Sequence, residues 1–321
     1  MRILFPQSVP IPRPGVMQLA AVLHQAGCRC RVMVAAKERD PVRAALRWRP
    51  DVLALSCMTG EHREMLSLAA KIRGSAPGIV VVMGGPHATA WPQVIEHPAL
   101  DIICRGEGEE AFVELVDRLA TGADTGDIEN LWVKTSAGVR RNPMRPPPGD
   151  LDRLPFPARE VYRSNWLGRR HPMVLSGRGC PFDCSFCINP TMRSLYGLSR
   201  TAYTRRRSPG SVLEELELLV ARDPVKVVEF VDDLFTLDHA WLRDFLPEYR
   251  ARIGRPFVCD VRADTLHAGI VRDWGWRGAR RCAWASSRAA NACASRSIAS
   301  ACRRRSCAEL LGSYGRRGYG C

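Results

Sequence analysis

Residues 79–86 read Ile-Val-Val-Val-Met-Gly-Gly-Pro, a short apolar run that stops at two glycines and a proline. Four to eight apolar residues bounded by turn residues are typical of a buried strand. Similar apolar segments occur at residues 2–5, 31–34, 51–57 and 101–104. Amphipathic segments between them predict helices at residues 15–25, 61–73 and 108–119. Strands that alternate with helices indicate a parallel sheet covered on both faces, so we expect a doubly wound, Rossmann-like α/β domain over residues 1–140.

A proline-rich stretch follows this part of the chain. Residues 143–157 hold six prolines, which cannot continue a helix or a central strand, so we expect a linker over residues 141–168. Strand and helix patterns then alternate again, with strands predicted at 173–176, 225–231 and 257–261 and helices at 211–221 and 241–252. Polar residues follow these strands, as in barrel enzymes. Residues 169–272 therefore predict part of a (β/α) barrel.

Composition narrows the class of protein. The chain has 321 residues, is 46% hydrophobic and contains no apolar run long enough to span a membrane. Its first apolar residues end at Pro6, too early for a signal-peptide core, so we expect a cytoplasmic protein. Its 13 cysteines then favour metal ligands or free thiols over disulfides. The net charge of +14 would suit nucleic acid, but 10 arginines lie after residue 272, and we expect no nucleic-acid partner.

The cysteines of residues 179–187, Gly-Cys-Pro-Phe-Asp-Cys-Ser-Phe-Cys, have the spacing of a metal site. Cys180, Cys184 and Cys187 form a C-x3-C-x2-C pattern on a loop directly after a predicted strand. Three thiolates can hold three corners of a cubane cluster, and no fourth cysteine follows nearby, which would leave one iron open to an outside ligand. Zinc is the main alternative, although a second C-x2-C pair would have favoured it.

This loop, with Arg178 and Gly179 before it and Phe186 ahead of its last cysteine, resembles the signature of the radical S-adenosylmethionine superfamily. The resemblance implies a 4Fe-4S cluster whose open iron binds the amine and carboxylate of S-adenosylmethionine, with Phe186 beside that cofactor. Reduction of the cluster by an external donor such as flavodoxin or ferredoxin would cleave the cofactor to a 5'-deoxyadenosyl radical. That radical would take hydrogen from a small-molecule substrate, while the protein binds, orients and excludes water.

Three charged residues at later strand ends extend the resemblance. Asp232 and Asp233 end a segment that resembles the second barrel strand of cobalamin-linked radical enzymes, where an acid would accept hydrogen bonds from the methionine ammonium. The alternative is a solvated pair of strand-end acids or a helix N-cap. Arg262 could pair with the methionine carboxylate or a substrate acid, although on its own it is better explained as a solvated strand-end residue.

Small residues at two strand ends of the first domain suggest a second cofactor. Ser56 and Thr59 follow one strand, and Gly84 and Gly85 follow the next, so a large flat cofactor could approach the backbone at this edge. The stretch to about Leu119, including residues 105–109, resembles the cobalamin-binding domain found ahead of radical S-adenosylmethionine domains. Residues 6–15 hold no His to lie beneath cobalt, so cobalamin would bind without that ligand; alternatively the first domain holds none.

Residues 273–321 form an Arg-, Ala-, Ser- and Cys-rich tail that is too poor in branched aliphatic residues to build a core. We expect no barrel strand and probable disorder there. A second metal site is one alternative, using Cys282, Cys293, Cys302, Cys307 and Cys321. A truncated or frameshifted gene after about residue 272 is another, and we favour it because an alternate frame can be written that resembles the fourth barrel strand.

The sequence thus predicts a cobalamin-dependent radical S-adenosylmethionine enzyme, with methyl transfer to an unactivated carbon as the expected chemistry. Ring formation or rearrangement without cobalamin is the alternative within the enzyme class. A catalytically incomplete, truncated product is the alternative outside it.

Overall fold

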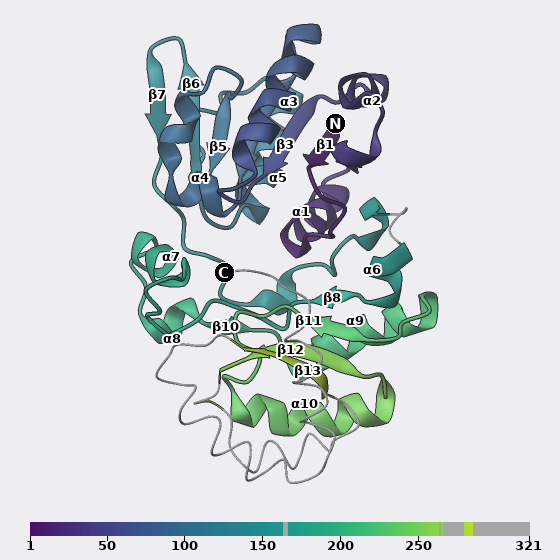
Figure 1. Cartoon of the computed structure of the whole chain (residues 1–321). Coiled ribbons are helices and arrows are strands. Elements are labelled where there is room, and N and C mark those ends of the chain that lie inside the picture. The colour runs from purple at the N-terminus through teal and green to yellow at the C-terminus, as the bar shows by residue number, and fades with distance from the viewer. Residues whose placement is uncertain (163–165, 263–264, 266–278, 285–321) are drawn as a thin grey trace.

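The computed structural model describes residues 1–162, 166–262, 265 and 279–284. Within these residues the chain forms two α/β parts, each built around its own sheet (Figure 1). The expected tail beyond residue 284 and the candidate ligands Cys293, Cys302, Cys307 and Cys321 lie outside the described residues. No helix among the described residues is long and apolar enough to cross a membrane.

The first sheet has seven strands in the order β2-β1-β3-β4-β5-β6-β7. Their bounds are β1 Arg2–Gln7, β2 Arg29–Val34, β3 Val52–Ser56, β4 Val80–Gly84, β5 Ile102–Cys104, β6 Leu131–Thr135 and β7 Gly138–Arg141. The first five strands run parallel and confirm the doubly wound fold. β6 and β7 add an antiparallel hairpin that the sequence pattern did not predict.

Helices cover both faces of this sheet, because each apolar face of the sheet must be buried against another element. The helices are α1 Pro14–Gln25, α2 Pro41–Trp48, α3 His62–Ser75, α4 Pro86–Ala90 and α5 Glu109–Thr121, with 3-10 turns at Ala35–Lys37 and Pro92–Glu96. α2 and α3 pack against one face through residues such as Met65 and Ile72, and α1 and α5 pack against the other through Leu23 and Phe112. Pro at the first turn and Asp40 at the N-cap fix the start of α2.

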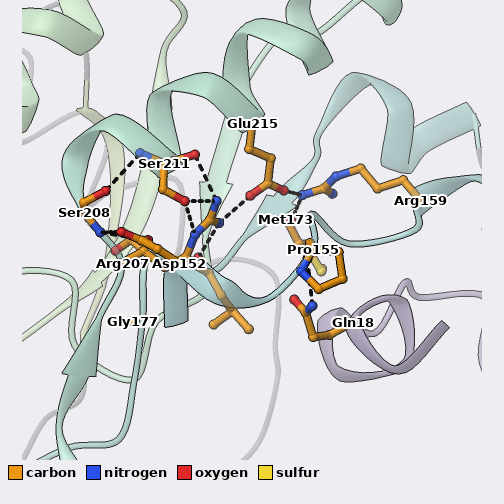
Figure 2. Close-up of polar contacts among 12 residues, drawn as sticks. Gln18, Asp152, Pro155, Arg159, Met173, Gly177, Arg207, Ser208, Ser211 and Glu215 are labelled. Carbon is orange, nitrogen blue, oxygen red and sulfur yellow. Dashed lines mark hydrogen bonds and ion pairs between the residues drawn. The ribbon is translucent and has the colours of Figure 1, made fainter. Parts of the chain in front are cut away.

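The proline-rich segment contains no α-helix or β-strand from residue 142 to 162, although it has 3-10 turns at Leu151–Arg153 and Arg159–Tyr162. It lies against both parts of the chain (Figure 2). Gln18 of α1 donates from Nε2 to the Pro155 carbonyl at 2.8 Å, and the Asp152 carboxylate accepts from the Ser208 amide at 3.0 Å. The segment therefore packs as an ordered strap, with α6 at Trp166–Arg170 after it.

The second sheet has four parallel strands in the order β13-β12-β11-β8. Its strands are β8 Met173–Val174, β11 Val228–Phe230, β12 Phe257–Val261 and β13 Ala279–Trp284. The helices of this part are α7 Asn189–Leu195, α8 Arg200–Tyr203, α9 Pro209–Arg222 and α10 His239–Arg252. α9 and α10 cover the face on which Phe230, Phe235, Phe245 and Phe257 pack ring against ring. This arrangement is a partial (β/α) barrel.

Strand β13 contradicts the expectation that residues after 272 form no barrel strand. Its backbone pairs in parallel with β12, with Val261 opposite Trp284. The physical reason is that a sheet ladder is formed by backbone N–H and C=O groups, which an Arg-rich segment possesses like any other. Composition was therefore a poor guide to pairing along the open edge of β12.

Candidate functional site

The carboxyl ends of the parallel strands of the first sheet face the second part of the chain (Figure 1). α4, directly after β4, contacts α7, which lies just beyond the cysteine loop. In open α/β sheets, ligands bind at the carboxyl edge. The two edges predicted to bind cofactors therefore lie against each other.

A short antiparallel ladder closes the cysteine loop at its base. β9 (Gly177–Arg178) pairs with β10 (Arg205–Arg206), so the intervening residues form one closed excursion from the barrel. Gly179 has φ +85°, and a Cβ there would lie 2.3 Å from the Tyr203 carbonyl oxygen. Only glycine tolerates both conditions, which fixes the backbone immediately before Cys180.

The three predicted ligand cysteines lie together on this loop as free, half-buried thiols. The Cys187 amide donates to the Cys184 carbonyl at 3.0 Å, which turns the chain between these residues. The amide and side-chain NH₂ of Asn189 lie 3.5 and 3.7 Å from the Cys187 sulfur. Burial raises the pKa of Cys180, and a hydrogen bond from the Phe182 amide opposes that shift. Backbone and side-chain donors thus surround the loop as they would surround thiolates.

Among the described residues, no three His, Cys, Asp or Glu side chains converge closely enough to hold a single metal ion. Such a site requires all its ligand atoms at about 2.0–2.3 Å from one centre. A cubane is different because each thiolate binds its own iron at a separate corner.

Arg262, at the end of β12, reaches this loop. Its Nη1 donates to the Cys184 sulfur at 3.2 Å, and its guanidinium stacks over the Phe182 ring at 4.0 Å. The structure therefore brings Arg262 to the cysteines, where the sequence favoured a solvated strand-end residue.

The adjacent acids Asp232 and Asp233 have different surroundings. Asp232 is buried and accepts from the Ser176 amide and hydroxyl, both at 2.7 Å, and from the Gly177 amide at 2.6 Å. Burial raises the pKa of Asp232, and nearby Arg206 and these donors oppose that shift. Asp233 is exposed and close enough to Cys180 and Asp260 to affect their pKa values. Asp232 therefore holds the entry to the loop, and Asp233 is the acid available to a ligand.

Phe186 exposes 72% of its surface, although it is a large aromatic residue. Val9 and Ile11, after β1, and Met58, after β3, are also exposed at the carboxyl edge of the first sheet. Val9, Ile11 and Met58 thus offer exposed apolar side chains at the predicted cobalamin edge.

The predicted cobalamin edge consists of small residues in close backbone contact. Gly85 has φ +90°, and a Cβ there would lie 3.0 Å from both the amide nitrogen and the carbonyl oxygen of Cys57. Ser56 lies beside Gly85, and its carbonyl accepts from Arg13 at 2.5 Å. A Cβ on Gly84 would make only ordinary contacts, at 3.7 Å from Cys104. Gly85 is therefore the position in this pair where a side chain is excluded.

Thr59 and His87 meet at the same edge. The Thr59 hydroxyl lies 3.3 Å from His87 Nδ1, and the His87 ring stacks on His62 at 3.9 Å. His87 is buried in α4, and burial lowers its pKa. The structure thus places this histidine in helix packing.

The loop after β1 is fixed by residues that the sequence did not single out. The Tyr162 hydroxyl donates to Gln7 Oε1 at 2.7 Å and accepts from the Arg13 amide at 3.1 Å. Arg13 also pairs with Glu61 at 2.5 Å. These contacts join segments far apart in the chain, which no local pattern could have revealed.

Three other cysteines of the first domain, Cys28, Cys57 and Cys104, are buried. Cys30 is only half-buried. Burial raises the pKa of Cys57 and Cys104 to about 12, so both remain neutral thiols.

Comparison with known proteins agrees with this geometry. Residues 9–116 match the B12 binding domain family. The chain is 32% identical over 206 residues to the uncharacterized methyltransferase PH0819 of Pyrococcus horikoshii, covering 62% of this chain and 43% of that protein. It is 29% identical over 255 residues to the anaerobic magnesium-protoporphyrin IX monomethyl ester cyclase of Rubrivivax gelatinosus, covering 74% and 44%. The chain thus spans less than half the length of these two relatives.

A solved structure has the same fold. The radical S-adenosylmethionine methyltransferase TsrM from Kitasatospora setae, with cobalamin and a [4Fe-4S] cluster bound, matches with a TM-score of 0.69 at 19% identity. The match covers 89% of this chain and 59% of that one. Residues 9–116 thus form a B12 binding domain, and the part that follows has the partial barrel fold seen in a radical S-adenosylmethionine methyltransferase. The chain is similar to cobalamin-dependent radical S-adenosylmethionine methyltransferases.

Proposed function

We propose that this chain is the cofactor-binding portion of a cobalamin-dependent radical S-adenosylmethionine enzyme that methylates an unactivated carbon of a small molecule. The observation that carries the proposal is the position of three free thiols on one loop whose neighbours α7 and Arg178 contact the B12-binding domain. When bound, the cluster and S-adenosylmethionine would supply a 5'-deoxyadenosyl radical, and cobalamin would supply a methyl group. Methyltransferases among the relatives favour this outcome over ring formation.

The residues of this chain would bind and orient these groups. Cys180, Cys184 and Cys187 would hold the cluster, and Arg262 would donate a hydrogen bond to the Cys184 sulfur. Asp233 would accept from the methionine ammonium, with exposed Phe186 beside the cofactor. We assign the cofactor role of the acid pair to Asp233, because every donor recorded at Asp232 comes from the loop entry.

Ser56, Thr59, Gly84 and Gly85 would line the cobalamin edge, where Val9, Ile11 and Met58 offer apolar surface to a flat ring system. The chain would comprise a B12-binding domain over residues 1–140, a linker over 141–168 and a partial barrel over 169–272, to which β13 of the segment 273–321 adds a strand. The proposal also includes a cytoplasmic setting with a one-electron protein donor, because a reducing compartment keeps thiols free.

Metal and cofactor analysis of anaerobically reconstituted protein tests this proposal. We expect about four irons and four sulfides per chain, and an electron paramagnetic resonance signal of the reduced protein that changes when S-adenosylmethionine is added. Replacing all three loop cysteines with alanine should abolish both, whereas the matched control Cys30→Ala should retain them. Zinc in place of iron, or equal iron in both variants, would contradict the proposal.

Visible absorbance of the same samples tests the cobalamin assignment. Gly85→Ala should reduce cobalamin binding, because its Cβ would press on the Cys57 backbone at a positive φ. Gly78→Ala is the matched control, since a Cβ there meets nothing within 4 Å. Iron content and circular dichroism identify a Gly85→Ala protein that has merely unfolded. Wild-type protein that binds iron but no cobalamin would favour an enzyme whose first domain has lost the cofactor.

A further inference from the structure

Glu107 and Glu109, in the segment after β5, lie at the boundary between the two parts of the chain and pair with arginines of the cysteine loop. Glu107 Oε2 lies 2.6 Å from Arg178 Nη1 and 3.1 Å from Arg205 Nη1, and its Oε1 pairs with Arg205 Nη2. Glu109 Oε1 lies 2.7 Å from Arg178 Nη2. We call these four residues the carboxylate–arginine clamp. Its two negative and two positive charges balance.

The clamp is largely removed from solvent. Arg205 and Glu109 each expose 6% of their side-chain surface, and Arg178 and Glu107 expose 18% and 19%. Burial opposes ionisation of Glu107, but the hydrogen bonds and charges of Arg205 and Arg178 lower its pKa overall. Charge-assisted pairs at this depth are little screened by salt and have a defined geometry.

The backbone of Glu107 is fixed as firmly as its carboxylate. The Glu107 amide donates to the Tyr196 hydroxyl at 2.7 Å, and the Glu107 carbonyl accepts from Asn130 Nδ2 at 2.7 Å. The preceding Gly106 has φ +75°, and its amide donates to the Thr89 hydroxyl at 2.9 Å. Residue 107 is thereby a rigid point of the first domain, held on one side by β6 and α4 neighbours and on the other by the cysteine-loop excursion.

The two arginines hold opposite ends of that excursion. Arg178 and Arg205 are register partners in the β9–β10 ladder, and the loop with Cys180, Cys184 and Cys187 lies between them. Tyr196 comes from the same excursion, after α7. The first domain therefore contacts the entry, the exit and the interior of the cysteine loop, the last at Tyr196 and through α7. A contact that only joined two domains would not need all three.

We propose that the carboxylate–arginine clamp positions the cysteine loop against the cobalamin edge, making Glu107 a positioning residue for the cluster. This inference rests on the proposed function for its meaning but not for its test. Residues 105–109 belong to the B12-binding match, yet in this chain the carboxylates of Glu107 and Glu109 face the arginines of the second part. Residues 105–109 thus fix where the cysteine loop lies relative to the cobalamin edge.

Hydrogen exchange of the metal-free, full-length protein tests the positioning role directly. Glu107→Gln should increase exchange of the protected amides in residues 177–206 about tenfold or more, because Arg205 loses its charged partner and Arg178 keeps only Glu109. Glu215→Gln is the matched control: Glu215 is also buried between two arginines, Arg159 and Arg207, but neither arginine lies in the β9–β10 ladder. That variant should increase exchange around α9 and leave residues 179–204 unchanged.

Two further variants distinguish positioning from a loss of folding. Arg178→Lys keeps the charge but cannot serve both Glu107 and Glu109, so it should give part of the Glu107→Gln effect. Glu110→Gln, on the neighbouring exposed acid, should give none. Equal exchange of the loop amides in wild type and Glu107→Gln would overturn the inference. A uniform increase of exchange across the whole chain in both Glu107→Gln and Glu215→Gln would overturn it as well. Failure of wild-type protein to bind iron would contradict the proposed function while leaving this measurement valid.

Discussion

Glu107 and Glu215 offer a comparison of two regions that use the same chemistry for different ends. Each is a carboxylate held by two arginines with little solvent access. Glu215, on α9, pairs with Arg159 at 2.6 Å and with Arg207 at 2.5 Å (Figure 2). Arg159 donates to the carbonyl of Met173 in β8, and Arg207 donates to the carbonyl of Leu175 just after that strand. Glu107 instead pairs across the boundary between the two parts. The same ion-pair arrangement fixes a strap to its own barrel in one region and positions a cofactor loop in the other.

The two glutamates differ in which part of the structure would loosen if each were lost. Arg159 belongs to the strap and Arg207 follows β10, so loss of Glu215 would loosen the packing of the second part around β8. Loss of Glu107 would leave the seven-stranded and four-stranded sheets intact and loosen the cysteine loop at the boundary between them. A buried ion pair is therefore weak evidence of function until its partners are placed on their elements.

The largest expected effect is on the free energy of unfolding of Glu215→Ala. The Glu215 side chain is 3% exposed, so its removal leaves two buried guanidinium groups without their carboxylate. Breaking such a pair from one side costs about 3–5 kcal/mol. Urea unfolding followed by circular dichroism would measure the loss. Glu217 lies two positions after Glu215 and is an exposed acid paired with Arg252. The Glu217→Ala variant should be indistinguishable from wild type in its free energy of unfolding. Equal stability of the two variants would contradict the comparison.

The second effect separates the adjacent acids of the loop entry. Asp232→Asn would turn one acceptor oxygen into a donor that faces the donors of Ser176 or Gly177. Leaving buried donors unpaired costs about 1–3 kcal/mol. Asp233→Asn, at an exposed position, should leave the unfolding midpoint unchanged and weaken S-adenosylmethionine binding instead. Urea midpoints and calorimetric titration of the cofactor would test the pair, and the opposite pattern would reverse the assignment of the two roles.

These contrasts also indicate how far the sequence could predict the structure. The inner parallel strands β1, β3, β4 and β5 were predictable because a strand buried on both faces must be mostly apolar, whereas the edge strand β2, with exposed Arg29 and Arg31, was predicted only over residues 31–34. The β6–β7 hairpin was missed because Trp132 and Lys134 alternate with buried residues and Gly138–Arg141 is largely polar, which resembles a surface loop. β13 was missed because its pairing depends on the free edge of β12.

The candidate site divides in the same way. Cys180, Cys184 and Cys187 could be found because the spacing of ligands on one loop is a local property. Asp232 and Asp233 could not be told apart, because their roles depend on which side of the strand end meets Ser176 and Gly177. The clamp was invisible, since Glu107 and Arg178 lie 71 residues apart and no repeat or motif links them.

The smallest expected effect concerns the hydroxyl of Tyr196, the one interior point at which the clamp region reaches the cysteine loop. Tyr196→Phe removes the acceptor of the Glu107 amide but keeps the ring that packs near Tyr203. The loss of one hydrogen bond lowers the free energy of unfolding by about 1 kcal/mol. Because Arg178 and Arg205 still hold both ends of the loop, exchange should increase around residue 196 and at the Glu107 amide but not at Cys180. Tyr203→Phe is the matched control, since its hydroxyl donates to Asn189 within the loop rather than across the boundary. If Tyr196→Phe loosened the whole loop as much as Glu107→Gln, the tyrosine rather than the arginine pair would be the main positioning contact.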